Sequence, residues 1–177
     1  MNRLIFGLFF GLLAIMYCSF AVAEDATGNL NYFFGKKKVS DNMGTGSDLD
    51  DHNEIGIMLD IGPQNYVNWA IDYFESDGDD SGDTLEIKEI CLGMRKYFEN
   101  DPVMIPFLGA GAAYFSADLK SAKPISDKEI GIWFSGGIVF RLNRQFNLGV
   151  LLRWSYADID GYNVGGLHGG IMAGLHF

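Results

Sequence analysis

The side chains best suited to acid–base chemistry are the three histidines, His52, His168 and His176. His168 lies in an alternating segment near the carboxy-terminus, and the alternating segment before it carries Arg153 and Ser155. If these two segments pair as a tight hairpin, His168 lies opposite Arg153 and close to Ser155. A serine within hydrogen-bond reach of a histidine could act as a nucleophile with its base. The simpler interpretation is an interior histidine whose neighbours satisfy its ring nitrogens.

Charged residues of both signs form a second group that could do chemistry. They stand on the polar side of segments in which every second residue is apolar: Asp60, Asp72, Glu89, Arg95, Arg141 and Arg153. An unpaired ion in a low-dielectric interior costs several kcal/mol, so such charges are tolerated only as pairs. The six residues therefore predict a lumenal charge network that closes the interior. A gated or proton-conducting channel built on the same charges is the alternative.

A dense run of carboxylates and turn residues spans residues 75–83. Hard divalent cations such as Ca²⁺ take several oxygen ligands, and four residues could supply them: Asp77, Asp79, Asp80 and Asp83. The spacing differs from that of the EF-hand loop, which needs a glutamate at its twelfth position. The alternative to a cation site is a solvated, negatively charged loop.

Three consecutive lysines, Lys36, Lys37 and Lys38, follow the first alternating segment of an otherwise acidic chain. If that segment crosses a bilayer, the lysines reach the headgroup region. Basic side chains at this height attract lipid phosphates. The sequence therefore predicts contact with lipopolysaccharide phosphates, with a solvated loop start as the alternative.

Eight segments alternate apolar and polar residues with a period of two, which is typical of β-strands with two different faces. The expected strands are 29–35, 54–62, 66–75, 85–98, 105–116, 130–142, 146–157 and 164–177. Leu85 and Ile87 are out of phase with the rest of their strand, which predicts a bulge or an extension beyond the bilayer. Short turns alternate with longer polar loops, as an even number of antiparallel strands requires when both ends lie on one side.

The chemistry of the two strand faces indicates which one points outward. The polar face carries glycines and charges, whereas the apolar face carries aromatics near the strand ends, among them Phe146 and Trp154. Aromatic girdles of this kind mark membrane barrels. A soluble lipocalin-like barrel alternates as well, but with its apolar face inward. We therefore expect an all-β fold, an eight-stranded antiparallel transmembrane β-barrel with up-and-down order, with the soluble barrel as the alternative.

The last expected strand ends on an aromatic residue and has apolar residues at every second position: Ile171, Ala173, Leu175 and Phe177. With the stretches 93–98 and 106–111, this ending resembles the small eight-stranded outer-membrane proteins, namely the OmpA transmembrane domain, OmpX and the opacity-type adhesins. The resemblance implies a location in the cell outer membrane with both termini periplasmic. It also implies insertion by the barrel-assembly machinery, which reads the terminal strand.

Residues 1–23 are expected to be a cleaved signal peptide. Arg3 is the only charge before Glu24, and residues 21–23 form a small-x-small cleavage site after an apolar stretch. Cleavage leaves one domain, residues 24–177, with a net charge of 12 − 23 = −11 once Arg3 is removed from the 13 basic residues. A chain this acidic is a poor partner for nucleic acid. Residues 24–177 contain a single cysteine, Cys91, which excludes a disulfide within this domain.

These patterns predict a location and a shape more strongly than an activity. We expect a non-catalytic barrel without a cofactor, with a structural, envelope-integrity or surface-interaction role and with outer-membrane lipid and lipopolysaccharide as its surroundings. The alternative is a lipid A-modifying hydrolase or acyltransferase that uses His168 or His52, although the His-x-Ser-Asn stretch of the lipid A deacylases is not found. A narrow small-solute channel is a weaker alternative. No pattern indicates a specific ligand, a partner or an oligomeric state.

Overall fold

The computed structural model describes residues 26–39, 51–63, 67–80, 83–120, 125–159 and 162–177. The wall strands are β1 (Ala26–Val39), β2 (Asp51–Pro63), β3 (Val67–Asp80), β4 (Asp83–Tyr97), β5 (Met104–Lys120), β6 (Ile125–Arg141), β7 (Phe146–Tyr156) and β10 (Gly166–His176). A small hairpin pairs β8 (Asp158–Ile159) with β9 (Tyr162–Asn163). Within these ranges there is no helix long and apolar enough to cross a membrane.

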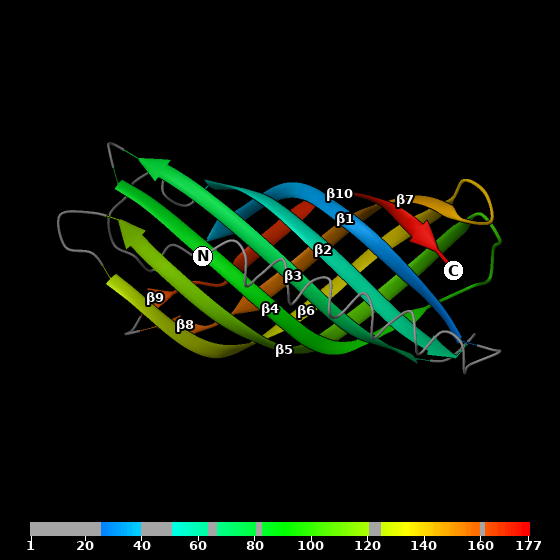
Figure 1. Ribbon diagram of the computed structural model, residues 1–177, viewed down its shortest axis with the longest axis horizontal. Coiled ribbons are helices and arrows are strands. Elements are labelled where there is room, and N and C mark those ends of the chain that lie inside the picture. The colour runs from blue at the N-terminus through cyan, green and yellow to red at the C-terminus, as the bar shows by residue number, and fades with distance from the viewer. Residues whose placement is uncertain (1–25, 40–50, 64–66, 81–82, 121–124, 160–161) are drawn as a thin grey trace, which may run out of the picture.

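The eight wall strands form a closed antiparallel barrel in the order β1-β10-β7-β6-β5-β4-β3-β2 (Figure 1). Strands adjacent in the wall are successive along the chain, apart from the short β8–β9 hairpin and the pairing of β1 with β10 that closes the barrel. The predicted fold class is therefore confirmed. Most of the strands extend beyond their predicted limits at the loop end, and the β8–β9 hairpin occupies a segment that the sequence marked only as a loop.

The strands are strongly tilted because the pairing register climbs around the wall. Starting from Asn29 on β1, the paired residues lead around the barrel through Ser155 and Gly166 and return to β1 at Val39. The climb is 39 − 29 = 10 residues. Such a stagger sets the tilt and the width of a closed barrel. Because of this stagger, side chains that lie at the same depth of the interior are not direct partners in the strand pairing. Residues distant in sequence can therefore meet there.

Along the strands, exposed and buried residues alternate with the same period as apolar and polar residues do in the sequence. Along β7, every residue is exposed or buried in turn, with Leu148, Val150 and Leu152 exposed and Asn147 and Arg153 buried. The apolar face therefore points outward and the polar face inward. This arrangement excludes the lipocalin-like alternative, in which the apolar face lines the interior.

The interior changes character along the barrel axis. At the loop end it is apolar, filled by side chains from several strands and from the β8–β9 hairpin: Leu85, Ile87, Phe115, Ala117, Ile159 and Val164. Of the two alternatives for Leu85 and Ile87, the bulge is wrong, because β4 pairs without interruption with both β3 and β5. The extension beyond the bilayer stays a prediction. These two residues keep the strand's phase and face inward. Their apolar character reflects a hydrophobic closure of this end.

Side chains fix the short turns at the other end of the barrel. The Asp101 carboxylate accepts the backbone N–H groups of Val103 at 2.7 Å and Met104 at 3.0 Å. These two bonds favour the ionised carboxylate and hold the pKa of Asp101 below its usual value.

The Phe177 N–H donates to the Gly28 carbonyl at 3.0 Å, and the Gly28 N–H donates to the Phe177 carbonyl at 2.9 Å. The seam between β1 and β10 is thus paired up to residue 177.

We predict that Val150→Arg destabilises the barrel because Val150 lies at the middle of β7 on the apolar face. Arginine on the lipid face at the bilayer midplane costs about 2–4 kcal/mol. The measurement is guanidinium unfolding in phospholipid vesicles, with Val150→Met as the matched apolar control. Equal midpoints for the two variants would contradict the assignment of the outer face.

Candidate functional site

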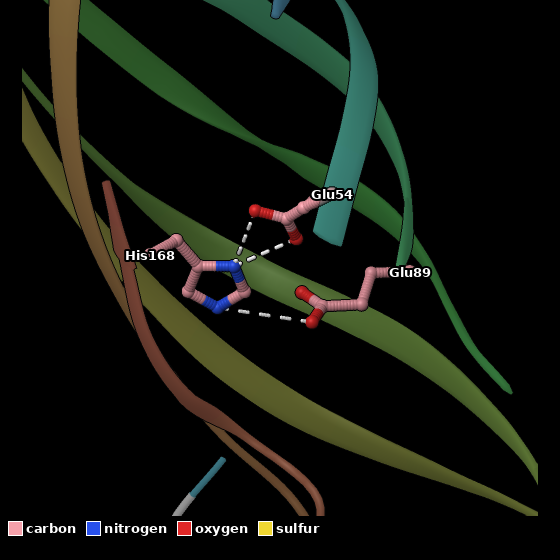
Figure 2. Close-up of side chains that lie close together, drawn as sticks. All are labelled: Glu54, Glu89 and His168. Carbon is pink, nitrogen blue, oxygen red and sulfur yellow. Dashed lines mark hydrogen bonds and ion pairs between the residues drawn. The ribbon is translucent and has the colours of Figure 1, made fainter. Parts of the chain in front are cut away.

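Six buried side chains from five strands meet in the loop-side half of the interior. We call them the His168 cluster: Lys37, Glu54, Glu89, Arg153, Ser155 and His168. Each is at most 2% exposed. The register places His168 directly between Lys37 on β1 and Arg153 on β7, which confirms the predicted hairpin pairing. Glu54 and Glu89 reach the same point from β2 and β4 (Figure 2).

Both ring nitrogens of His168 have partners. Nδ1 lies 2.8 and 2.9 Å from the two carboxylate oxygens of Glu54 (Figure 2). Nε2 lies 2.8 Å from the Ser155 hydroxyl. Because a carboxylate only accepts, we assign the imidazole proton to Nδ1, which leaves Nε2 free to accept from Ser155. A guanidinium nitrogen of Arg153 lies 3.4 Å from the same Nε2.

Glu89 is the shared counter-ion of the cluster. Its Oε1 accepts from the Lys37 ammonium at 2.6 Å, and its Oε2 accepts from Arg153 at 2.5 Å. With Glu54 the cluster holds two carboxylates, and Lys37 and Arg153 supply two cations. The formal charges therefore cancel while His168 is neutral, as burial requires.

The arrangement of Ser155, His168 and Glu54 has the hydrogen-bond order of a nucleophile, a base and an orienting carboxylate. Access is the missing requirement for acyl-transfer chemistry. Ser155 and His168 are both 0% exposed, and aromatic rings and ion pairs surround them. The geometry supports a rigid interior hydrogen-bond network better than a substrate site.

Ligand atoms of Glu54, Glu89 and His168 lie within 4.8 Å of one another, close enough to hold a metal ion. Two carboxylates and an imidazole suit several divalent transition metals. The ion pairs of Glu89 with Lys37 and Arg153 argue against such a site. A divalent cation would add two positive charges to a cluster that is already neutral, so the charge balance favours the ion pairs alone.

A second polar group, the Arg95 cluster, fills the turn-side half of the interior. The Arg95 guanidinium donates to Asp60 at 3.1 Å and to Asp72 at 2.7 Å. Asp60 also accepts from three neutral donors, at 2.7 Å from the Tyr97 hydroxyl and at 3.0 Å from the amides of Asn29 and Asn68. Four donors disperse the charge of one carboxylate, which offsets its removal from water.

Aromatic rings separate and support the two clusters. The Arg153 guanidinium carbon lies 4.6 Å from the centre of the Phe74 ring and 5.9 Å from that of Trp133, and Arg95 lies 5.6 Å from Phe107. Cation–π contact of this kind strengthens when water is excluded. The Trp133 indole N–H donates to the Ala112 carbonyl at 3.1 Å. The interior is therefore filled with side chains along its length, as an eight-stranded barrel allows.

Five of the six residues predicted to form the lumenal charge network lie in these two clusters: Asp60, Asp72, Glu89, Arg95 and Arg153. Arg141 does not belong to them. It pairs with Glu99 at 2.7 Å beside the short turns, and its side chain remains 24% exposed. Its placement in the lumenal network is wrong, because β6 ends at Arg141 and the side chain reaches the rim.

The structure separates the three lysines that the sequence grouped together. Lys36 and Lys38 are exposed on the outer face of β1, and for them headgroup contact stays a prediction. The expectation is wrong for Lys37, which is buried and pairs with Glu89. His52 precedes the expected strand 54–62, and the structure places it on β2. It faces inward from β2 opposite Lys37.

Other predicted site residues are placed without being brought together. Asp77 and Asp79 are exposed on β3, and Asp79 accepts a 2.7 Å bond from Thr84, while the side chains of Asp80 and Asp83 lie outside the described residues. In the terminal strand Ile171 and Leu175 face outward and Ala173 is half-buried. The expected signal peptide, residues 1–23, lies outside the described residues as well.

The charge network predicted from the sequence leaves out several polar residues that belong to the two clusters, namely Asn29, Lys37, Glu54, Asn68 and Tyr97. The alternation in the sequence indicates their position, because each of these residues falls on the polar, inward face of its strand. On β1, outward Leu30, Tyr32 and Phe34 place Lys37 inward if the alternation is continued. Lys37 therefore differs from Lys36 and Lys38, whose phase is outward.

Solved structures of known proteins share this architecture. Neisserial surface protein A is 15% identical, with a TM-score of 0.64 over 85% of this chain and 95% of that chain. The N-terminal β-barrel domain of Pseudomonas aeruginosa OprF is 15% identical, with a TM-score of 0.61 over 86% and 98%. Ail, the attachment invasion locus protein of Yersinia pestis, is 14% identical, with a TM-score of 0.62 over 86% and 99%.

These neighbours are small eight-stranded outer-membrane β-barrels, and this chain has their fold. At this level of identity the likeness concerns the fold alone. No protein-family model and no curated protein matches the chain. Evidence about function must therefore come from the residues of this chain.

We predict that Glu89→Gln destabilises the barrel by about 3–5 kcal/mol, because it leaves Lys37 and Arg153 buried without their shared counter-ion. Glu86→Gln on the same strand is the control. Its ion pair with Lys88 is partly exposed and is worth about 0–1 kcal/mol. Unfolding midpoints in detergent micelles compare the two variants. A Glu89 variant as stable as the Glu86 variant would contradict the role of Glu89.

Proposed function

We propose that this protein is a non-catalytic integral barrel of the Gram-negative outer membrane that supports the envelope or presents its loops for surface interactions. The observation that carries the proposal is the combination of an apolar outer wall with an interior filled by paired charges and aromatic rings. Such a molecule is stable only in a bilayer, and it has a rigid frame that can display loops. The names of two neighbours, a surface protein and an attachment protein, agree with a surface role.

The orientation we propose places the short turns and both termini in the periplasm. Strands β3 and β4 form a long hairpin at the opposite end, and β5 and β6 form another. Outer-membrane barrels have short periplasmic turns and longer extracellular loops. In this orientation Lys36 and Lys38 lie toward the outer leaflet, where lipopolysaccharide phosphates are the expected partners. The terminal strand, β10, is then the segment offered to the barrel-assembly machinery.

A lipid A-modifying hydrolase or acyltransferase is the second candidate function. Its support is the hydrogen-bonded order of Ser155, His168 and Glu54. The complete burial of these side chains favours the non-catalytic role, since a lipid A acyl chain has no route to the Ser155 hydroxyl across the paired wall of β6, β7 and β10.

We predict that expression of the protein leaves the acyl pattern of lipid A unchanged. The measurement is mass spectrometry of lipid A from cells that carry wild type, Ser155→Ala or an empty vector. Identical profiles in all three support the non-catalytic role. Loss or gain of an acyl chain with wild type, abolished by Ser155→Ala in a protein that still folds, would establish the enzyme instead.

We also predict that the barrel does not conduct in planar bilayers, because the Arg95 and His168 clusters and the apolar loop-end closure fill its lumen. Reconstituted protein should give no steady current above the lipid background. A stable conductance that changes in a Lys37→Met variant would show that the lumenal ion pairs form a conducting path and would favour the channel.

A further inference from the structure

A depression of about 420 Å³ lies at the short-turn end of the barrel, beside the carboxy-terminal end of β10 (Figure 1). Five residues line it, namely Pro102, Arg141, Asn143, Arg144 and His176. Arg141 and His176 end β6 and β10 on the inward phase of these strands. The depression therefore belongs to the aqueous mouth of the lumen and not to the lipid-facing wall.

Two guanidinium groups supply the depression with hydrogen-bond donors. Arg141 donates to Glu99 through one nitrogen at 2.7 Å, and its side chain remains partly exposed. Arg144 is exposed and forms no ion pair with a described residue. The carboxylate of Asp101 is occupied by the backbone N–H groups of its own turn. The positive charge of Arg144 is thus left without a counter-ion among the described residues.

Asn143 fixes the turn that carries Arg144. Its side-chain oxygen accepts the backbone N–H groups of Gln145 at 2.8 Å and Phe146 at 2.9 Å. The turn is therefore held by the acceptor end of the amide alone. The NH₂ group at the other end of the same amide adds a neutral donor to the depression.

A buried amide stands between the two rim residues of the wall. Asn147 is 2% exposed, and it pairs in register with Arg141 on one side and with Gly174, two residues before His176, on the other. Neither polar atom of its amide has a hydrogen-bond partner among the described residues. Buried polar groups are almost always hydrogen-bonded. An amide in this position is satisfied when a polar molecule enters from the mouth of the lumen.

His176 adds an acceptor to these donors. The amide nitrogen of Asn29 donates to Asp60 at 3.0 Å, so its oxygen is the atom that meets the His176 ring, 3.2 Å from Nδ1. Because an amide oxygen only accepts, we assign the ring proton to Nδ1. Nε2 of the uncharged ring is then a lone-pair acceptor, and a ligand beside it must provide a donor.

We propose that this depression binds inorganic phosphate that retains a proton. The phosphate oxygens accept from the guanidinium groups of Arg141 and Arg144, whose planar donor forks match oxyanions. The remaining O–H of the phosphate donates to Nε2 of His176. A lipid headgroup with a phosphodiester carries no such O–H, so the acceptor favours a soluble phosphate. In the proposed orientation this mouth of the lumen opens to the periplasm.

Sulfate tests the proposal because it has the shape and charge of hydrogen phosphate but no O–H. A site that hydrogen-bonds an O–H rejects the analogue that lacks it. The measurement is equilibrium dialysis of maltoside-solubilised protein against radiolabelled phosphate at about pH 8, above the ordinary pKa of a histidine. Wild type should bind one phosphate, and sulfate should compete about tenfold more weakly than unlabelled phosphate.

Two variants separate the contributions of charge and acceptor. Arg144→Gln should weaken phosphate binding about tenfold, the loss expected for one charge-assisted hydrogen bond. His176→Asn keeps a donor in the position of Nδ1 and removes Nε2, so phosphate and sulfate should then compete equally. Lys128→Gln is the matched control, because it removes one positive charge from the exposed loop end of β6.

A heat-shift gel of each variant shows whether the barrel has folded. If His176→Asn does not fold, the competition between phosphate and sulfate on wild type decides. Equal competition by the two anions on wild type overturns the site, as do equal losses of binding in Arg144→Gln and Lys128→Gln. The absence of saturable phosphate binding overturns it as well.

Discussion

Charge pairing inside a narrow lumen is the constraint on which the rest of this structure depends. An eight-stranded barrel has room for side chains but little for water. Among the described residues, buried charges come from five of the eight wall strands, namely β1, β2, β3, β4 and β7. Each of the two clusters joins carboxylates to an arginine across several strands. A slip of one residue in any of these five strands would turn its charges toward lipid and its outward apolar residues inward. The charges therefore specify the register as well as fill the lumen.

The stagger of the barrel explains how these pairs arise from distant segments. Because the register climbs around the wall, Glu54 and His168, 114 residues apart, meet at one depth. The same geometry produces an enzyme-like order of serine, histidine and glutamate without an accessible surface. Hydrogen-bond order alone is therefore weak evidence for catalysis in a barrel, where many inward polar groups are confined to a small space. Burial distinguishes a structural network from a site that acts on a substrate.

Much of the fold could be predicted because alternation is a local property. On β7 the alternation predicted a strand over 146–157 with its apolar face outward. The strand spans Phe146–Tyr156, and the burial pattern confirms the face. The wrong predictions share one cause. Alternation within a strand indicates which way a side chain faces, but not how far along the barrel axis the residue lies. Lys37 and Leu85 are inward residues whose type suggested another environment, and Arg141 has an inward phase but lies at the rim. Side-chain partners such as Glu54 and His168 depend on the stagger of the whole barrel. The stagger is a property of how all strands pair, so the sequence of one segment does not indicate it.

The central claim is that the chain forms a closed membrane barrel with its apolar face outward. The most direct test is the mobility of detergent-folded protein on a cold SDS gel before and after boiling, with circular dichroism of the same sample. A closed membrane barrel should give a compact band that shifts on boiling and a β-sheet spectrum that depends on detergent or lipid. A band that does not shift, from a protein that stays soluble without detergent, would contradict it.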